Sequence, residues 1–132
     1  MKKTVLALAL AIGTLAVVID SEAYPEISTD DLKKAISSKK VTLIDVNGSE
    51  SWQRGHIPGA LNFAVVGKNL ATKLPADKKA LVVAYCCNER CSAYRQAATA
   101  AKDLGYTNVK HYAKGIQGWT ALGEATEKGS SK

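Results

Sequence analysis

One stretch of this chain decides how the rest of it is interpreted: Val82-Val83-Ala84-Tyr85-Cys86-Cys87-Asn88-Glu89-Arg90-Cys91-Ser92-Ala93. It begins as a continuous apolar run of strand length, which is typical of a central strand in a parallel sheet covered on both faces. The run ends in a short polar loop that holds all three cysteines of the chain, and an alanine-rich, helix-forming segment follows. A thiol at the start of a helix is expected to ionise readily, so the stretch predicts a reactive-cysteine site.

The remaining segments predict the sheet around this stretch. A β-branched run at 41–46 contains Asp45 near its end, an alternating segment follows at 61–65, and residues 108–112 form a last strand. Helical segments separate these strands, and the first of them begins after the capping residue Ser28. The alternation predicts an α/β domain with a mainly parallel sheet flanked by helices. Ligands of such sheets bind beyond the carboxyl ends of the strands, where Asp45 and the cysteine loop are both expected.

The N-terminus has the features of an export signal. Lys2 and Lys3 form a basic region, residues 4–18 form an apolar region, and small residues lead to Ala23. This pattern predicts a signal peptide over residues 1–23 that is cleaved after Ala23. The mature protein would then be periplasmic or secreted, with no membrane attachment after cleavage. An N-terminal anchor that is retained is the alternative interpretation.

The mature chain has the length of one domain. We place this domain at 24–122 and interpret the charged, Gly/Ser-ending tail at 123–132 as disordered. The net charge is +6, but the lysines are spread in pairs and are not interleaved with aromatic residues in one stripe. The charge therefore indicates an ordinary solvated surface with a mild attraction for anions, and we expect no nucleic-acid partner. We also expect a monomer that needs no cofactor.

The cysteine loop itself predicts nucleophilic chemistry. Bridges among three cysteines confined to six residues would close only very small loops, so these residues do not form a stabilising disulfide framework. Cys86, at the strand end, is the predicted catalytic nucleophile, supported by Arg95 in the first turn of the helix and by Asp45, which orders the adjoining loops. Successive N–H groups in such a loop can cradle an anion. The predicted substrate-binding residues are Cys87, Asn88, Glu89, Arg90, Cys91 and Ser92. A thiolate beside an anion cradle suits attack on a sulfur or phosphorus oxyanion.

Five segments stand in the order and spacing of a known family: Val41-Thr42-Leu43-Ile44-Asp45-Val46, Gly55-His56-Ile57-Pro58-Gly59-Ala60, Val82-Val83-Ala84-Tyr85-Cys86, Leu104-Gly105-Tyr106 and Gly115-Ile116-Gln117-Gly118-Trp119. From about Ile27 to Trp119 the chain resembles a single-domain rhodanese. The resemblance implies a mainly parallel, five-stranded sheet with helices on both faces, and thiosulfate or related sulfurtransferase activity. It also implies that Cys86 takes sulfur from a donor as a persulfide and passes it to a thiol or to cyanide.

Two features depart from the usual pattern of that family. Asn47 stands where the family usually has an arginine, and the loop after Cys86 has no glycine and is about two residues longer. The Cys-x4-Cys spacing of Cys86 and Cys91 resembles a subgroup of exported or uncharacterised rhodanese-like proteins. Phosphatases and arsenate reductases that share the fold use a Cys-x5-Arg loop. Here Ser92 occupies the position of that arginine, which argues against phosphatase activity.

The roles of the other two cysteines stay open at this point. Cys91 could resolve an oxidised or persulfidated Cys86 as a disulfide, or it could be an ordinary small loop residue, and the same choice applies to Cys87. Two other functions are alternatives: a non-enzymatic module that binds soft metal ions or partner thiols, and a disulfide-exchange protein. The loop has no histidine to complete a closed zinc site, and we expect no metal. Four further residues are interpreted as structural: Trp52 and Trp119 in the core, His56 in a turn, and His111 on a strand surface.

Overall fold

The computed structural model describes residues 24–129. The predicted signal peptide and its cleavage site after Ala23 therefore lie outside the described residues, as do residues 130–132. Within the described part, no helix combines the length and the apolar character needed to cross a bilayer.

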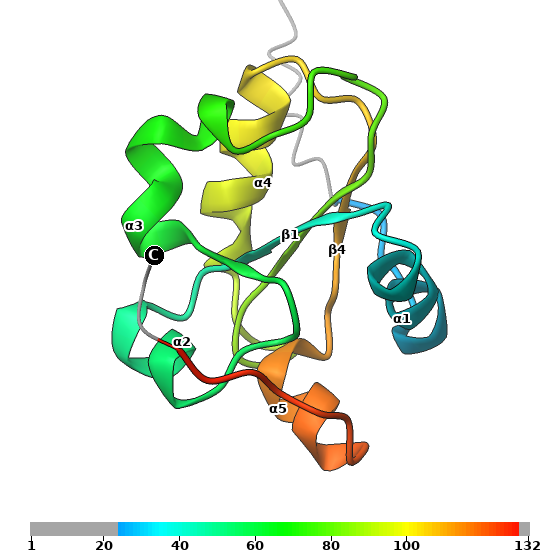
Figure 1. The fold of residues 1–132 in the computed structure, drawn as a ribbon, viewed down its shortest axis with the longest axis vertical. Coiled ribbons are helices and arrows are strands. Elements are labelled where there is room, and N and C mark those ends of the chain that lie inside the picture. The colour runs from blue at the N-terminus through cyan, green and yellow to red at the C-terminus, as the bar shows by residue number, and fades with distance from the viewer. Residues whose placement is uncertain (1–23, 130–132) are drawn as a thin grey trace, which may run out of the picture.

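A four-stranded parallel sheet forms the centre of the molecule, in the order β2-β1-β3-β4 (Figure 1). Its strands are β1 (Thr42–Asp45), β2 (Leu61–Asn62), β3 (Val82–Tyr85) and β4 (Val109–His111). The two longest strands, β1 and β3, pair in the middle, and all four residues of β3 are buried. The predicted strand 61–65 is shorter than expected, because a helix begins at Phe63.

The predicted fifth strand is reduced to a single parallel bridge between Glu26 and His111. The backbone N–H of Ile27 donates to the His111 carbonyl, and the His111 N–H donates to the Pro25 carbonyl, each at 2.9 Å. The chain then turns into the first helix at Ser28, so the pairing with β4 extends no further along the described chain.

Helices cover both faces of the sheet, as predicted (Figure 1). They are α1 (Thr29–Ser37), α2 (Ser49–Arg54), α3 (Phe63–Val66), the 3-10 helix η1 (Gly67–Thr72), α4 (Tyr94–Asp103) and α5 (Gly115–Ala121). The predicted cap is present, since the Ser28 hydroxyl accepts a hydrogen bond from the Asp31 N–H at 3.1 Å. Capping of this kind offsets one of the unpaired N–H groups at a helix start.

The two faces of the sheet build two separate apolar clusters. Successive residues of a strand point to opposite faces, so Ile44 packs with the alanines of α4 on one side, while Leu43 packs with α1 on the other. The α4 face contains Ala97, Ala98 and Ala101, all fully buried. Their small side chains let the helix approach the sheet closely, which fixes the position of the helix that follows the cysteine loop.

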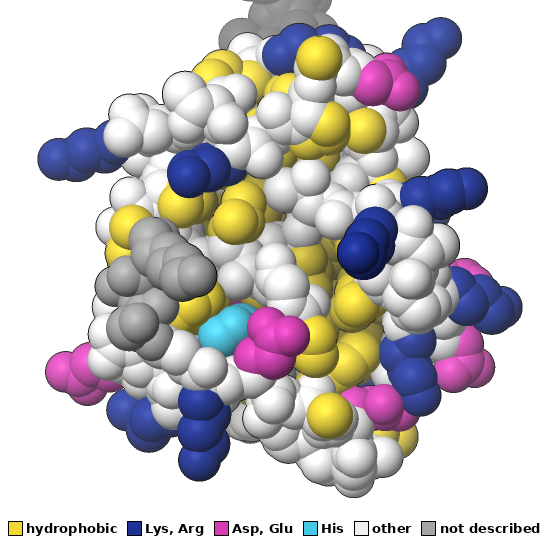
Figure 2. All heavy atoms as spheres, viewed as in Figure 1, with side chains coloured by type: hydrophobic (Ala, Val, Ile, Leu, Met, Phe, Trp, Pro, Cys, Tyr) yellow, Lys and Arg dark blue, Asp and Glu magenta, His cyan; other side chains and the backbone are white. Residues whose placement is uncertain are grey.

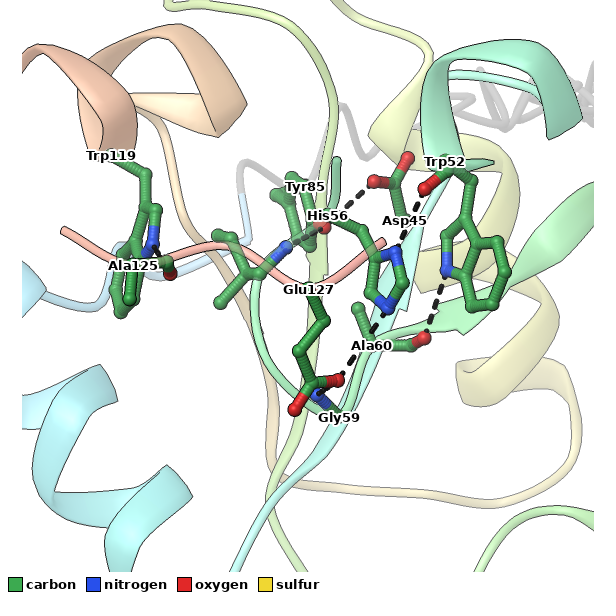
Figure 3. Close-up of polar contacts among 10 residues, drawn as sticks. Asp45, Trp52, His56, Gly59, Ala60, Tyr85, Trp119, Ala125 and Glu127 are labelled. Atoms are coloured by element: carbon green, nitrogen blue, oxygen red, sulfur yellow. Dashed lines mark hydrogen bonds and ion pairs between the residues drawn. The ribbon is translucent and has the colours of Figure 1, made fainter. Parts of the chain in front are cut away.

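A buried hydrogen-bond chain ties the ends of β1 and β3 to the turn 55–60 (Figure 3). The Tyr85 hydroxyl donates to the Asp45 carboxylate at 2.7 Å and accepts from the Ile57 N–H at 3.0 Å. The same carboxylate accepts from the Asn47 N–H at 2.7 Å. Burial is the main cause that raises the pKa of Asp45, and the hydrogen bonds from Tyr85 and Asn47 oppose it. Asp45 thus orders the adjoining loops by accepting hydrogen bonds.

Residues 123–129 differ from the disorder expected of the tail, because they run back across the turn 55–60 (Figures 1 and 3). His56 and Glu127 exchange two backbone hydrogen bonds of 2.9 Å. The Glu127 carboxylate also accepts from the Gly59 N–H at 3.1 Å and lies 3.6 Å from His56 Nε2. The Trp119 indole N–H donates to the Ala125 carbonyl at 2.8 Å. The partners of Glu127 lie about 70 residues earlier in the chain, in the turn 55–60. The polar composition of the segment gives no sign of these contacts.

Removing the returning segment should destabilise the domain. A chain that ends at Gly123 loses the hydrogen bonds to His56, Gly59 and Trp119, each worth about 1 kcal/mol. The entropy of the released segment offsets part of this loss. We expect the free energy of unfolding to fall by about 1–3 kcal/mol, measured by urea denaturation. A chain that ends at Gly129 is the matched control and should keep its full stability. Equal unfolding midpoints for the two truncations would contradict a structural role of the segment.

Candidate active site

The cysteine loop connects the end of β3 to the start of α4. Cys86 follows Tyr85 directly, its side chain is 1% exposed, and its thiol donates to the Cys91 carbonyl at 3.1 Å. Asn88 closes the turn from inside the loop: its carbonyl accepts from the Cys91 N–H at 3.2 Å, and its side-chain oxygen accepts from the Arg90 N–H at 3.0 Å. The loop therefore folds over the Cys86 sulfur and removes it from solvent.

Helix α5 forms a second wall of the site, which sequence reasoning did not assign to it. The N–H groups of Ile116 and Gln117 donate to the carbonyls of Cys86 and Cys87, each at 3.0 Å. Gly115 permits this approach, since its φ is +61° and an added Cβ would lie 2.5 Å from the Cys86 oxygen. The start of α5 thus fixes the first two peptide groups of the loop. The only signal for this contact was the Gly-Ile-Gln-Gly-Trp segment within the family resemblance.

The surroundings shift the pKa values of the three thiols in different directions, and Cys86 is not the thiol whose ionisation they favour, although a readily ionised Cys86 was expected. Burial and the hydrogen bond with Cys91 raise the pKa of Cys86 to about 12, against the opposing N–H groups of Tyr94 and Cys87. Burial also opposes ionisation of Cys91, but hydrogen bonds from the Cys86 thiol and from the N–H groups of Ala93 and Cys87 outweigh it and lower the pKa of Cys91. Burial and the hydrogen bond with Cys91 raise the pKa of Cys87. The loop therefore stabilises a thiolate on Cys91 rather than on Cys86.

Two cavities flank the loop. The larger has a volume of about 750 Å³, and its lining includes Cys91 and Ser92 together with charged residues from several elements: Glu26, Glu89, Arg90, Arg95 and Lys114. The smaller, of about 570 Å³, lies between the loop and α5 and is lined by Asn88, Glu89, Arg90 and Gln117 among others. Cys86 lines neither of them. Small molecules can therefore reach the rim of the loop more easily than its strand-end thiol.

The structure brings most of the predicted site residues together. Arg90 borders both cavities, and exposed Arg95 lies over the Tyr94 ring with its guanidinium 5.5 Å from the ring centroid. Asp45 is buried at the end of β1 in the hydrogen-bond chain with Tyr85 and lines neither cavity. Among residues 24–129, no three His, Cys, Asp or Glu side chains are grouped so that they could hold a metal ion. A three-thiolate metal site therefore gains no support from the geometry.

His111 is buried, which corrects its interpretation as a strand-surface residue. Its ring stacks on Tyr94 at an interplanar angle of 7°, and its Nε2 has no hydrogen-bond partner within the described chain. Burial, and after it the charge of Arg95, lowers the pKa of His111 to about 4. The imidazole is therefore neutral at pH 7 and adds no charge to the larger cavity that it lines.

Comparison with known proteins identifies the family. The model of the rhodanese-like domain matches residues 28–122, which is most of the chain. The chain belongs to the rhodanese-like family. It is 31% identical over 108 residues to the thiosulfate:glutathione sulfurtransferase of Homo sapiens, covering 72% of this chain and 92% of the relative. It is 33% identical over 106 residues to an HTH-type transcriptional regulator of Mycobacterium tuberculosis, but that match covers 79% of this chain and only 45% of the regulator.

Solved structures of rhodanese-like proteins agree with this assignment. A rhodanese from E. coli, solved with anions, is 32% identical with a TM-score of 0.51, and the match covers 67% of this chain and 99% of that one. The human single-domain sulfurtransferase is 26% identical with a TM-score of 0.60, covering 75% and 97%. The prediction of a rhodanese-type sulfurtransferase is confirmed. The prediction of a helix-flanked parallel sheet is also confirmed, with four strands among residues 24–129 where five were expected.

Substitution of Gly115 by alanine should dislodge the cysteine loop. The new Cβ would lie within 2.7 Å of backbone atoms of Cys86 and Cys87, and the left-handed φ adds strain. We expect the free energy of unfolding to fall by about 3 kcal/mol or more in urea denaturation. Gly123→Ala is the matched control, because Gly123 also has a positive φ, of +76°, but an added Cβ meets nothing within 4 Å. An equal loss in both variants would show that the contact with the loop is unimportant.

The buried imidazole of His111 should make stability depend on pH. Its folded pKa of about 4 lies below its ordinary value of 6.5, so the unfolded chain binds a proton that the folded chain does not. Stability is therefore fully present above pH 6.5 and is lost as the pH falls towards 4, by about 1–3 kcal/mol. His111→Gln carries no such proton. The loss between pH 7 and pH 4.5 should be smaller in this variant, and identical losses would contradict the assignment.

Proposed function

We propose that this protein moves sulfane sulfur from a small anionic donor, such as thiosulfate, to a thiol or to cyanide through a persulfide on Cys86. The observation that carries the proposal is the position of Cys86 directly after the central strand, beside the N–H groups of Cys87 in the loop and of Tyr94 at the start of α4, which lower its pKa against the effect of burial. These N–H groups stabilise negative charge on that sulfur or on a sulfur attached to it. The relationship to the human thiosulfate:glutathione sulfurtransferase supports the choice of donor and acceptor.

The reaction needs no cofactor. The Cys86 thiolate attacks the outer sulfur of thiosulfate, a new S–S bond forms, and sulfite leaves with the electron pair of the bond that breaks. An acceptor thiolate or cyanide then attacks the outer sulfur of the persulfide and releases the Cys86 thiolate. The larger cavity places Arg90, Arg95 and Lys114 near the loop, against Glu26 and Glu89. This excess of positive charge supports binding of an anionic donor.

We place the domain at 24–129, past the predicted limit of 122, because residues 123–129 are hydrogen-bonded to the turn 55–60 and to Trp119. Export and a monomeric state are part of the same proposal. They are supported by the basic and apolar regions before Ala23 and by the absence of a sequence feature that demands a second subunit. Disulfide exchange between Cys86 and Cys91 is the second candidate function. It is favoured by the contact between these residues, in which the Cys86 thiol donates to the Cys91 carbonyl at 3.1 Å. A Cys86–Cys91 bridge with a measurable reduction potential would support it.

The test is to incubate the purified protein with thiosulfate and cyanide and to follow thiocyanate. We expect turnover, and we expect thiosulfate alone to add the mass of one sulfur atom to the peptide that contains Cys86. Cys86→Ser should lose activity by about 10³-fold or more, because the nucleophile is removed. A protein that forms no thiocyanate and gains no sulfur would overturn the proposal.

Removal of the Arg90 charge tests whether this side chain binds the donor. Arg90→Ala should raise the KM for thiosulfate several-fold, about 3- to 10-fold for one solvated charge, with little change in kcat. Arg54→Ala is the matched control, since the Arg54 side chain is 74% exposed on α2 and pairs only loosely with Glu50 at 3.9 Å. An unchanged KM in the Arg90 variant would remove this side chain from the donor site.

A further inference from the structure

The burial of Cys86 conflicts with direct attack on a donor from solution. Its side chain is 1% exposed and lines neither cavity beside the loop. Thiosulfate carries a bulky sulfonate group, which would have to pass through the folded loop to bring its outer sulfur to Cys86. Cys91, in contrast, is partly exposed and lines the larger cavity. Of these two thiols, Cys91 is the one that a molecule in that cavity meets first.

The N–H donors of the loop also converge on the sulfur of Cys91. The N–H groups of Ala93 and Cys87 and the neighbouring Cys86 side chain lower the pKa of Cys91. These contacts stabilise a thiolate, which is the attacking form of a cysteine. The Cys86 thiol donates to the Cys91 carbonyl at 3.1 Å, so the Cys86 sulfur lies against Cys91, and the two side chains shift each other's pKa.

The charges around the cavity suit an anionic donor at Cys91. The larger cavity is bordered by the cationic side chains Arg90, Arg95 and Lys114 and by the carboxylates of Glu26 and Glu89. His111 borders the same space and is neutral at pH 7. One net positive charge therefore remains among the charged side chains that line the cavity.

We propose that Cys91 is a second catalytic thiol, which takes sulfur from the donor in the cavity and relays it to the buried Cys86. The inference rests on the proposed sulfurtransferase function and replaces its first step: Cys91 attacks the donor in place of Cys86, and Cys86 receives the sulfur second. The Cys91 thiolate attacks the outer sulfur of thiosulfate, and sulfite leaves with the electron pair of the broken S–S bond. Cys91 then carries an S–S⁻ group at the mouth of the loop.

The second step passes this sulfur inward. The Cys86 thiol first gives its proton to the outer sulfur of the Cys91 persulfide, and the Cys86 thiolate then attacks that sulfur while the S–S bond to Cys91 breaks. The proton then moves to Cys91, so Cys86–SH and Cys91–S–S⁻ become Cys86–S–S⁻ and Cys91–SH. No oxidant or reductant is consumed. Because the step is a symmetrical exchange, it also runs backwards and returns sulfur to Cys91 for the acceptor. Burial of Cys86 then protects the stored sulfur from unselective thiols.

The cleavage pattern of trypsin makes the relay testable by peptide mass spectrometry. Cleavage after Arg90 separates Cys91 from the peptide that holds Cys86 and Cys87. The protein is treated with thiosulfate for different times, its persulfides are alkylated, and each peptide is weighed. Cys86→Ser should trap the added sulfur on the Cys91 peptide. Cys91→Ser should load its Cys86 peptide at least 10-fold more slowly than the wild-type protein. The peptide that ends at Arg90 contains both Cys86 and Cys87, so the Cys87→Ser variant shows which of the two carries the added sulfur.

A pH profile distinguishes chemistry from a purely structural role of Cys91. Sulfur uptake by the wild-type protein should reach half of its maximum below pH 9, whereas uptake by Cys91→Ser should require more alkaline conditions, because Cys86 is the harder thiol to ionise. Thermal unfolding of each variant checks that it is folded.

The outcomes separate the relay from the function on which it rests. If Cys91→Ser takes up sulfur on Cys86 at the wild-type rate, or if Cys86→Ser gains none on Cys91, the relay is overturned while transfer through Cys86 stands. If the wild-type protein gains no sulfur on any peptide, the proposed function fails, and the relay fails with it.

Discussion

The contact between the start of α5 and the cysteine loop is the constraint on which the site depends. The first two carbonyls of the loop accept N–H groups of α5, and Gly115 is the residue that lets the two backbones approach. Helix α5 is itself held by Trp119, whose ring is buried in the core cluster on that face of the sheet and whose indole N–H reaches Ala125. The geometry of the cysteine loop therefore depends on the packing of Trp119 in the core and on its hydrogen bond to the returning segment.

The site combines burial with reactivity by dividing them between two residues. A strand-end thiol inside the fold is protected, but burial disfavours its ionised form. The loop places a second thiol, that of Cys91, at the rim of a cavity, and the neighbouring N–H groups of Ala93 and Cys87 lower its pKa. The presence of this second thiol thus moves the favoured thiolate from Cys86 to Cys91. It does not change the frame of strand, loop and helix.

The hydrogen bonds at the ends of the strands hold loops in place and do not take part in the proposed chemistry. The chain from Asp45 through Tyr85 to the Ile57 N–H joins β1, β3 and the turn 55–60 in the interior, and Glu127 binds the same turn from outside (Figure 3). The basic side chains are distributed around the molecule rather than gathered in a stripe, as Figure 2 shows for one face. Polar groups therefore contribute to the function of this fold mainly by fixing loops, and the net positive charge acts diffusely.

The sequence by itself determined the α/β frame, the central strand that ends at Cys86, the cap at Ser28 and the family. These features depend on local patterns: apolar runs, capping residues and short motifs with fixed spacing. Only the tertiary structure decided that Cys91 is the acidic thiol, that α5 holds the loop, and that the tail returns to His56. Each of these depends on burial or on contacts between residues far apart in the chain. Because pKa and backbone order follow from such surroundings, no local pattern in the sequence could show them.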